Sequence, residues 1–112
     1  MNHGLSQQDM HEIISALRRF PDIEEALLFG SRAKGNFKPG SDIDIAIKGR
    51  GIKHSSVTEL SYILNEESIL PYFFDIVHFE QITEQELLEH IQRVGLSLYE
   101  RKRDFPEATI DG

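Results

Sequence analysis

Two aspartates in a strand-like segment are the residues of this sequence best suited to chemistry. Asp42 and Asp44 are separated by one residue inside the segment SDIDIAIK, residues 41–48. Successive side chains of a strand point to opposite faces, so the two carboxylates would share one face and the isoleucines between and after them the other. Two like charges about 4 Å apart repel by roughly 4 kcal/mol at an effective dielectric of 20. A hard divalent cation such as Mg²⁺ reverses the sign of that interaction, so the pattern predicts half of a metal site.

A third carboxylate interrupts the apolar segment FFDIVHF. Asp75 needs solvent, a partner or a metal, because an unpartnered buried carboxylate is costly. It could simply be an aspartate at a strand end that accepts hydrogen bonds from backbone donors. If its strand lies beside the strand of Asp42 and Asp44, the three carboxylates meet. Such a set can hold two divalent ions, the arrangement that clamps the attacking and leaving oxygens in nucleotidyl transfer.

A glycine and a serine follow the apolar run that ends at Phe29, and they are candidates for phosphate binding. Gly30 would let the backbone approach a triphosphate, and the Ser31 hydroxyl and nearby N–H groups could bind phosphate oxygens. A Gly-Ser pair alone usually marks only a turn, and the chain has no Walker P-loop. Arg32 and Lys34, with Lys38, could assist a triphosphate, although as a separate cluster they would be taken as solvated loop residues.

The expected secondary structure places these residues on a small sheet. Apolar spacing predicts a helix over residues 6–20, capped by Ser6, and strands over residues 25–29, 42–48 and 72–79. Capping boxes, Ser56 with Glu59 and Thr83 with Glu86, predict two further helices, the second ending near Gly95. A single helical turn is expected over residues 31–35. The fold class is therefore α/β or α+β, a small mixed sheet covered by helices.

Length and composition define the class of protein. The 112 residues suit one domain, expected over residues 1–100, and the charged residues 101–112 are expected to form a tail with little fixed structure. A net charge of −7 argues against an extended nucleic-acid surface. No apolar run reaches the ~20 residues of a membrane span, and the N-terminus does not resemble a secretory signal. The absence of cysteine fits a cytoplasmic location.

The combination of these motifs resembles a known superfamily. The segment GSRAKGNFKPGSDIDIAI, residues 30–47, matches the pattern of Gly-Ser, ten residues and Asp-x-Asp. This pattern is similar to that of the nucleotidyltransferase superfamily whose best-known fold is that of DNA polymerase beta. The chain length, FFDIVHF and the closing segment ELLEHIQRVGLSLYE resemble the minimal nucleotidyltransferases, the MNT group. The resemblance covers roughly residues 10–100.

The resemblance implies a reaction and a role for each motif. Asp42, Asp44 and Asp75 would be catalytic and would ligate Mg²⁺, with two ions expected. Gly30 and Ser31 would hold the phosphates of the substrate ATP. The reaction would transfer AMP to a hydroxyl, with pyrophosphate leaving, and Asp75 is the candidate to activate that hydroxyl. Many MNT proteins are antitoxins paired with a HEPN-domain toxin, and some adenylylate that partner on tyrosine, so a HEPN partner is expected here.

Two other functions fit parts of the same pattern. A non-catalytic module could neutralise a partner by covering it, although such a module would be free to lose its carboxylates. A nucleotide-sugar glycosyltransferase also uses an Asp-x-Asp metal site. That class leaves the Gly-Ser element unexplained, and its usual two-part architecture needs a longer chain. The nucleotidyltransferase hypothesis accounts for all the motifs.

Overall fold

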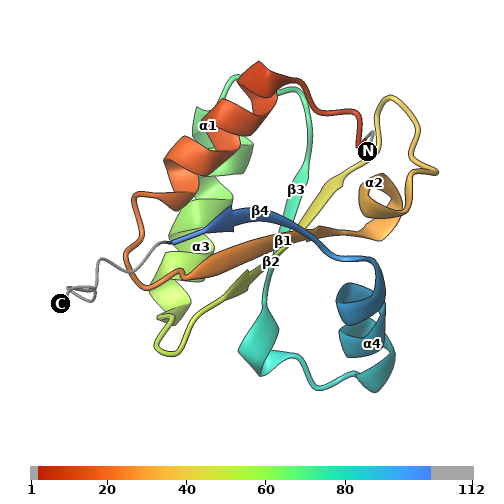
Figure 1. The fold of residues 1–112 in the computed structure, drawn as a ribbon. Coiled ribbons are helices and arrows are strands. Elements are labelled where there is room, and N and C mark those ends of the chain that lie inside the picture. The colour runs from red at the N-terminus through yellow and green to blue at the C-terminus, as the bar shows by residue number, and fades with distance from the viewer. Residues whose placement is uncertain (1–2, 102–112) are drawn as a thin grey trace, which may run out of the picture.

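Four strands form one mixed sheet in the computed structural model, which describes residues 3–101. Their order is β3-β2-β1-β4, with β2 and β3 parallel and the other neighbouring pairs antiparallel (Figure 1). The elements along the chain are α1 (Gln7–Leu17), β1 (Glu25–Phe29), α2 (Gly30–Lys34), β2 (Ile43–Lys48), α3 (His54–Tyr62) with a π-helical turn (Ile63–Glu67), β3 (Phe74–His78), a 3₁₀ turn (Phe79–Gln81), α4 (Gln85–Val94) and β4 (Leu96–Glu100). The predicted small mixed sheet with helices is confirmed.

The alternation expected for β2 is present. Ile43, Ile45 and Ile47 are fully buried in the main core, together with side chains of α1 and α3. On the opposite face, Ala46 packs in a second cluster with Ile91 of α4. Helices α1 and α3 therefore cover one face of the sheet, and α4 covers part of the other (Figure 1). Asp44 is on the α4 face, because it alternates with the isoleucines.

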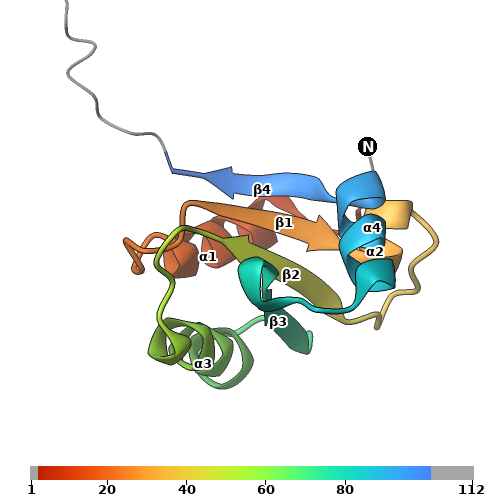
Figure 2. The same cartoon turned by 90° about the horizontal axis from the view of Figure 1, so that it is seen from below.

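Helices α2 and α4 lie at the end of the sheet at which β1 finishes. Helix α2 begins directly after β1, at Gly30. Figures 1 and 2 both place α2 and α4 side by side at this end, and the two helices are in contact. The first residue of β2, Ile43, lies at the same end, because β2 runs antiparallel to β1. The Gly-Ser and Asp-x-Asp motifs therefore meet there.

Helix α1 begins as the sequence predicted. The Ser6 hydroxyl accepts a hydrogen bond from the Asp9 amide at 3.0 Å. The Asp9 carboxylate in turn accepts one from the Ser6 amide at 3.1 Å, which completes a capping box. The N–H groups at the start of a helix have no partners within the helix, and this local pair satisfies two backbone donors there.

The two other predicted capping boxes are wrong. Helix α3 begins at His54, so Ser56 lies inside its first turn, and its hydroxyl donates to the Asp22 carboxylate at 2.6 Å. Asp22 also accepts from the Lys53 amide at 3.0 Å. Burial opposes ionisation, but these hydrogen bonds outweigh it and hold the pKa of Asp22 below its ordinary value. Helix α4 starts after Glu84 without a side-chain cap.

Strand β4, Leu96–Glu100, was not predicted. It pairs antiparallel with β1 and follows α4 after the single residue Gly95, with a register shift near Ala26. The pairing with β1, a contact between segments far apart in the chain, stabilises its extended conformation. The prediction of an irregular tail lies outside the described residues, except at Arg101, whose amide donates to the Glu24 carbonyl at 2.8 Å.

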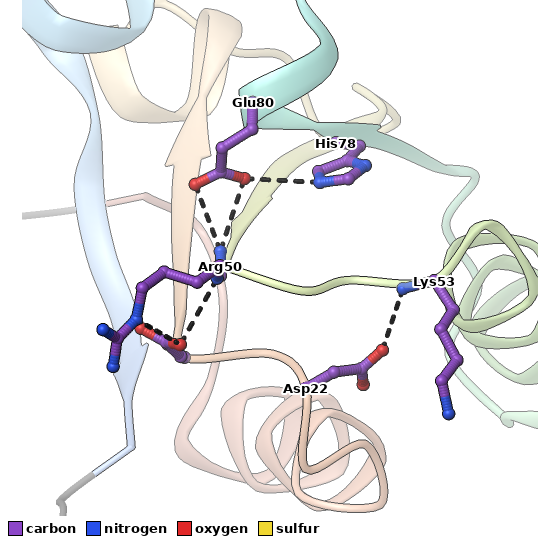
Figure 3. A network of polar contacts seen from close by, with 7 residues as sticks. Asp22, Arg50, Lys53, His78 and Glu80 are labelled. Carbon is purple, nitrogen blue, oxygen red and sulfur yellow. Dashed lines mark hydrogen bonds and ion pairs between the residues drawn. The ribbon is translucent and has the colours of Figure 1, made fainter.

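Polar contacts anchor the loop that follows β2 (Figure 3). The Gly49 amide donates to both oxygens of the Glu80 carboxylate, at 3.3 and 3.2 Å, and the same carboxylate lies 3.3 Å from Nε2 of His78. The Arg50 amide and side chain both contact Glu24. This network stabilises the end of β2 that is remote from the aspartates. Within residues 3–101, no helix has the length and apolar character needed to cross a membrane.

Candidate active site

The three predicted carboxylates are brought to the start of the parallel pair β2 and β3. Asp44 and Asp75 are direct partners in the register of the two strands, which lie about 4.8 Å apart in such a sheet. Asp42 precedes β2 by one residue and shares the face of Asp44 by the alternation of the strand. Asp42 and Asp75 are exposed, and Asp44 is partly buried. The condition on which the third carboxylate depended, that β3 lies beside β2, is therefore met.

Burial and the neighbouring negative charges raise the pKa of Asp44. Partial burial is the largest cause, and the negative charges of Asp75 and Asp42 add to it. The two neighbours therefore lie within electrostatic reach of Asp44. Three carboxylates that repel one another suit a hard cation with oxygen ligands such as Mg²⁺. Asp42, Asp44 and Asp75 are the residues that would hold it.

The carboxylates are not arranged as a formed cation site. Among residues 3–101, no three acidic or histidine side chains gather tightly enough, as they stand, to ligate an ion. Like charges favour such separation in the absence of a cation. Ligation would therefore require the carboxylates to turn towards one another, and Asp42 and Asp75 are exposed, so their side chains can adopt other rotamers.

Gly30 lies directly against Asp44. Phe29, the last residue of β1, is the register partner of Asp44, and Gly30 follows it with a φ of 75°. A Cβ added at Gly30 would collide with Oδ2 of Asp44. Both the left-handed backbone and this close approach require glycine. The first predicted phosphate-binding residue therefore lies beside the predicted metal ligands.

Arg32 does not point into solvent as a phosphate ligand would. Its side chain is 1% exposed, and its Nε and Nη2 donate to the Ser41 carbonyl at 3.2 and 3.0 Å. Nη1 donates to the His3 carbonyl at 3.1 Å. The guanidinium also lies between two rings, 5.0 Å from the centroid of Phe37 and 4.9 Å from that of Tyr72.

These contacts hold Arg32 within the fold, and its contact with a nucleotide stays a prediction. Ser41 is the residue before Asp42, and Tyr72 lies three residues before Asp75. One buried cation thus connects α2 with the segments that lead into both carboxylate-bearing strands. Lys34, by contrast, is exposed at the end of α2 and is available to a ligand.

The sequence analysis missed one residue beside the Gly-Ser turn. His90 of α4 accepts a hydrogen bond from the Gly30 amide at 3.1 Å, across 60 residues of sequence. Its ring also meets the ring of Phe29 edge to face, with the centroids 6.1 Å apart. No pattern in the sequence singles out His90, because the contact depends on how α4 packs against α2.

Comparison with known families identifies the fold. Residues 11–104 match the family model described as polymerase beta, nucleotidyltransferase. The chain belongs to this family. The resemblance inferred from the Gly-Ser and Asp-x-Asp motifs is thereby confirmed at the level of the family. No curated protein matches the chain significantly.

Solved structures with a similar fold include chains of toxin–antitoxin complexes. A chain of a toxin–antitoxin complex with AMP-PNP is 28% identical, with a TM-score of 0.68 over 86% of this chain and 77% of its own. A complex of tri-AMPylated Shewanella oneidensis HEPN toxin with MNT antitoxin matches at 26% identity, with a TM-score of 0.64 over 85% and 72%. The MntA–HepT toxin–antitoxin complex matches at 26% identity, with a TM-score of 0.63 over 86% and 74%. The similarity to MNT-type antitoxins is confirmed.

The first prediction concerns the pH dependence of metal-free stability. Because the pKa of Asp44 is raised, the folded protein binds more protons than the unfolded chain between 3.8 and the raised value. Its free energy of unfolding should therefore fall as pH rises through that window. Asp44→Asn removes this contribution, so at pH 7 in EDTA the variant should melt no lower than the wild type. Thermal denaturation across pH measures both, and a variant that melts far below the wild type would show that Asp44 is structural.

The second prediction distinguishes two effects of replacing Gly30: the collision with Asp44 and the cost of a positive φ. Gly30→Ala and Gly35→Ala both place alanine at a positive φ, and each should lose about 1–2 kcal/mol of stability. Only Gly30→Ala also displaces Asp44, because a Cβ at Gly35 meets nothing within 4 Å. Calorimetric titration with Mg²⁺–ATP should therefore show lost binding in Gly30→Ala alone. Equal affinities of the two variants would contradict the proposed contact.

The third prediction tests the positioning role of Arg32. Lysine cannot reproduce the fork that bonds Ser41 and His3, so Arg32→Lys should lower the free energy of unfolding by about 2 kcal/mol. Lys34→Ala, at an exposed position, should change it by less than about 0.5 kcal/mol. Urea denaturation measures both. Wild-type stability in Arg32→Lys, together with weaker ATP binding, would instead make Arg32 a phosphate ligand.

Proposed function

We propose that this chain is a Mg²⁺-dependent nucleotidyltransferase that transfers AMP from ATP to a hydroxyl of a partner protein. The acceptor we propose is a tyrosine of a HEPN-domain toxin, so that the chain acts as an antitoxin. The observation that carries the proposal is the register of Asp44 with Asp75, with Gly30 packed against Asp44. Three carboxylates beside a backbone turn of this kind suit a metal-bound triphosphate.

The proposed reaction is an in-line displacement at the α-phosphorus of ATP. The acceptor oxygen forms a bond to that phosphorus, the bond to the oxygen bridging to the β-phosphorus breaks, and pyrophosphate leaves. Asp75 accepts the proton of the acceptor hydroxyl, because it is the exposed carboxylate beside Asp44 on the edge strand. Bound Mg²⁺ would supply charge neutralisation of the triphosphate. Catalysis of this kind rests on positioning more than on covalent participation of the protein.

The remaining predicted residues are assigned by their exposure. Ser31 is partly buried at the start of α2, and Lys34 is exposed at its end. We assign the Ser31 hydroxyl and the Lys34 ammonium to the phosphates, with Gly30 allowing their close approach. Arg32 restrains the segment before Asp42, because its guanidinium donates two hydrogen bonds to the Ser41 carbonyl.

The comparisons support the choice of nucleotide and partner. One structural neighbour is a toxin–antitoxin complex with AMP-PNP, an ATP analogue. Another is a tri-AMPylated HEPN toxin in complex with an MNT antitoxin. A chain with a similar fold that carries carboxylates on two neighbouring strands is suited to the same transfer. The alternative, a module that neutralises a partner by binding alone, leaves the clustered carboxylates without a purpose.

Labelling tests the fourth prediction, protein adenylylation. The wild type and Asp42→Asn are incubated with α-³²P-ATP, Mg²⁺ and a HEPN-domain protein that co-purifies with the chain. The wild type should label that protein, and Asp42→Asn should lower the rate by at least about 10²-fold, since a metal-ligating charge is lost. A tyrosine in the labelled peptide, found by mass spectrometry, identifies the acceptor.

Complex formation by Asp42→Asn is the control. The variant changes an exposed residue outside the sheet, so it should still co-purify with the partner. If Asp42→Asn protects cells from the partner as well as the wild type does, protection comes from binding, and the transfer mechanism is refuted.

A further inference from the structure

A histidine of α4 contacts the backbone on which the nucleotide site depends. Nε2 of His90 lies 3.1 Å from the Gly30 nitrogen and accepts its hydrogen bond. The imidazole is held in place by the edge-to-face contact with Phe29, at an interplanar angle of 80°. Both contacts involve the junction between β1 and α2, where the backbone turns with a φ of 75°. Helix α4 thus fixes the junction from outside the sheet.

The direction of the hydrogen bond determines the state of the ring. An imidazole nitrogen accepts a hydrogen bond only when it carries no proton, so His90 is neutral with its proton on Nδ1. Partial burial is the largest cause that lowers the pKa of His90, and the positive charges of Arg93 on α4 and Lys34 on α2 lower it further. The surroundings therefore favour the form that can accept the bond.

Gly30, which donates this hydrogen bond, also lies directly against Asp44. Gly30 lies so close to Asp44 that a Cβ at this position would collide with Oδ2 of Asp44. The His90 bond restrains the peptide group that joins Phe29 to Gly30. A turn that contacts both a carboxylate and an imidazole is restrained by two groups, and such preorganisation suits a phosphate-binding turn.

We propose that His90 is a positioning residue of the nucleotide site, which holds the Gly30–Ser31 turn against Asp44 by accepting the Gly30 N–H hydrogen bond. This inference rests on the proposed function for its effect on ATP binding. The restraint of the turn itself does not depend on that function. His90 touches neither the phosphates nor the acceptor in this assignment, and it acts through Gly30.

Two substitutions separate the acceptor atom from the bulk of the ring. His90→Phe keeps a ring beside Phe29 and removes the acceptor. His90→Gln places an amide oxygen near the position of Nε2 and can restore the bond. His54→Phe, at the exposed first residue of α3, is the matched control for a histidine replaced by phenylalanine elsewhere.

The first measurement is amide hydrogen exchange at Gly30 in the metal-free proteins, followed by NMR. Exchange should be about five- to tenfold faster in His90→Phe than in the wild type, because one hydrogen bond is lost. It should be within about twofold of the wild type in His90→Gln and in His54→Phe. Unchanged exchange in His90→Phe would overturn the proposal, whatever the protein binds.

The second measurement is the Kd for Mg²⁺–ATP, determined by calorimetry on the same variants. His90→Phe should bind about five- to tenfold more weakly, with recovery in His90→Gln. Faster exchange without any change in Kd would refute the role in the nucleotide site. A wild type that fails to bind Mg²⁺–ATP would contradict the proposed function instead, and Gly30 exchange would still decide whether His90 holds the turn.

Discussion

The parallel pairing of β2 with β3 is the constraint on which the rest of this structure depends. It places Asp44 beside Asp75, and the pKa of Asp44 is raised by its burial and by the neighbouring charges. Such a pair destabilises the sheet unless a cation is bound. The pairing is retained because the opposite face of β2 is fully buried beneath α1 and α3. Burial of its isoleucines thus stabilises one face of β2, while repulsion among Asp42, Asp44 and Asp75 destabilises the other.

Long-range contacts surround the carboxylates and restrict the segments that carry them. Arg32 holds the carbonyl before Asp42 from within the core. His90 holds the Gly30 amide from α4. At the far end of β2, the Glu80 carboxylate holds the Gly49 amide. These contacts restrain the backbone around the site, while the side chains of Asp42 and Asp75 remain exposed. In the proposed metal site these two side chains would turn towards Asp44.

The division between buried and exposed cations at this site follows from their chemistry. The guanidinium of Arg32 offers a planar fork that the Ser41 carbonyl and two flanking rings satisfy. Its charge is delocalised and weakly hydrated, so it tolerates burial better than an ammonium. Lys34 carries a strongly hydrated point charge and stays in solvent. Two cations two residues apart in sequence therefore have different roles.

The sequence alone determined what short-range periodicity and chemistry encode. Alternation placed Asp42 and Asp44 opposite the core isoleucines, the Gly-Ser motif marked the turn, and Ser6 marked the start of α1. These features depend on neighbours in sequence, and the structure confirms them. The sequence also pointed to the family, because its motif combines residue types with a fixed spacing.

Only the tertiary structure decided which distant groups meet. Contacts between elements far apart in the chain decide the Asp44–Asp75 pairing, the hydrogen bonds of Asp22 at the start of α3 and strand β4. The contacts of Arg32 and His90 depend on them as well. The Gly30–His90 bond spans 60 residues, beyond the reach of any local pattern. Packing of the helices on the sheet fixes such contacts, because each requires a register or a helix position that no segment specifies by itself.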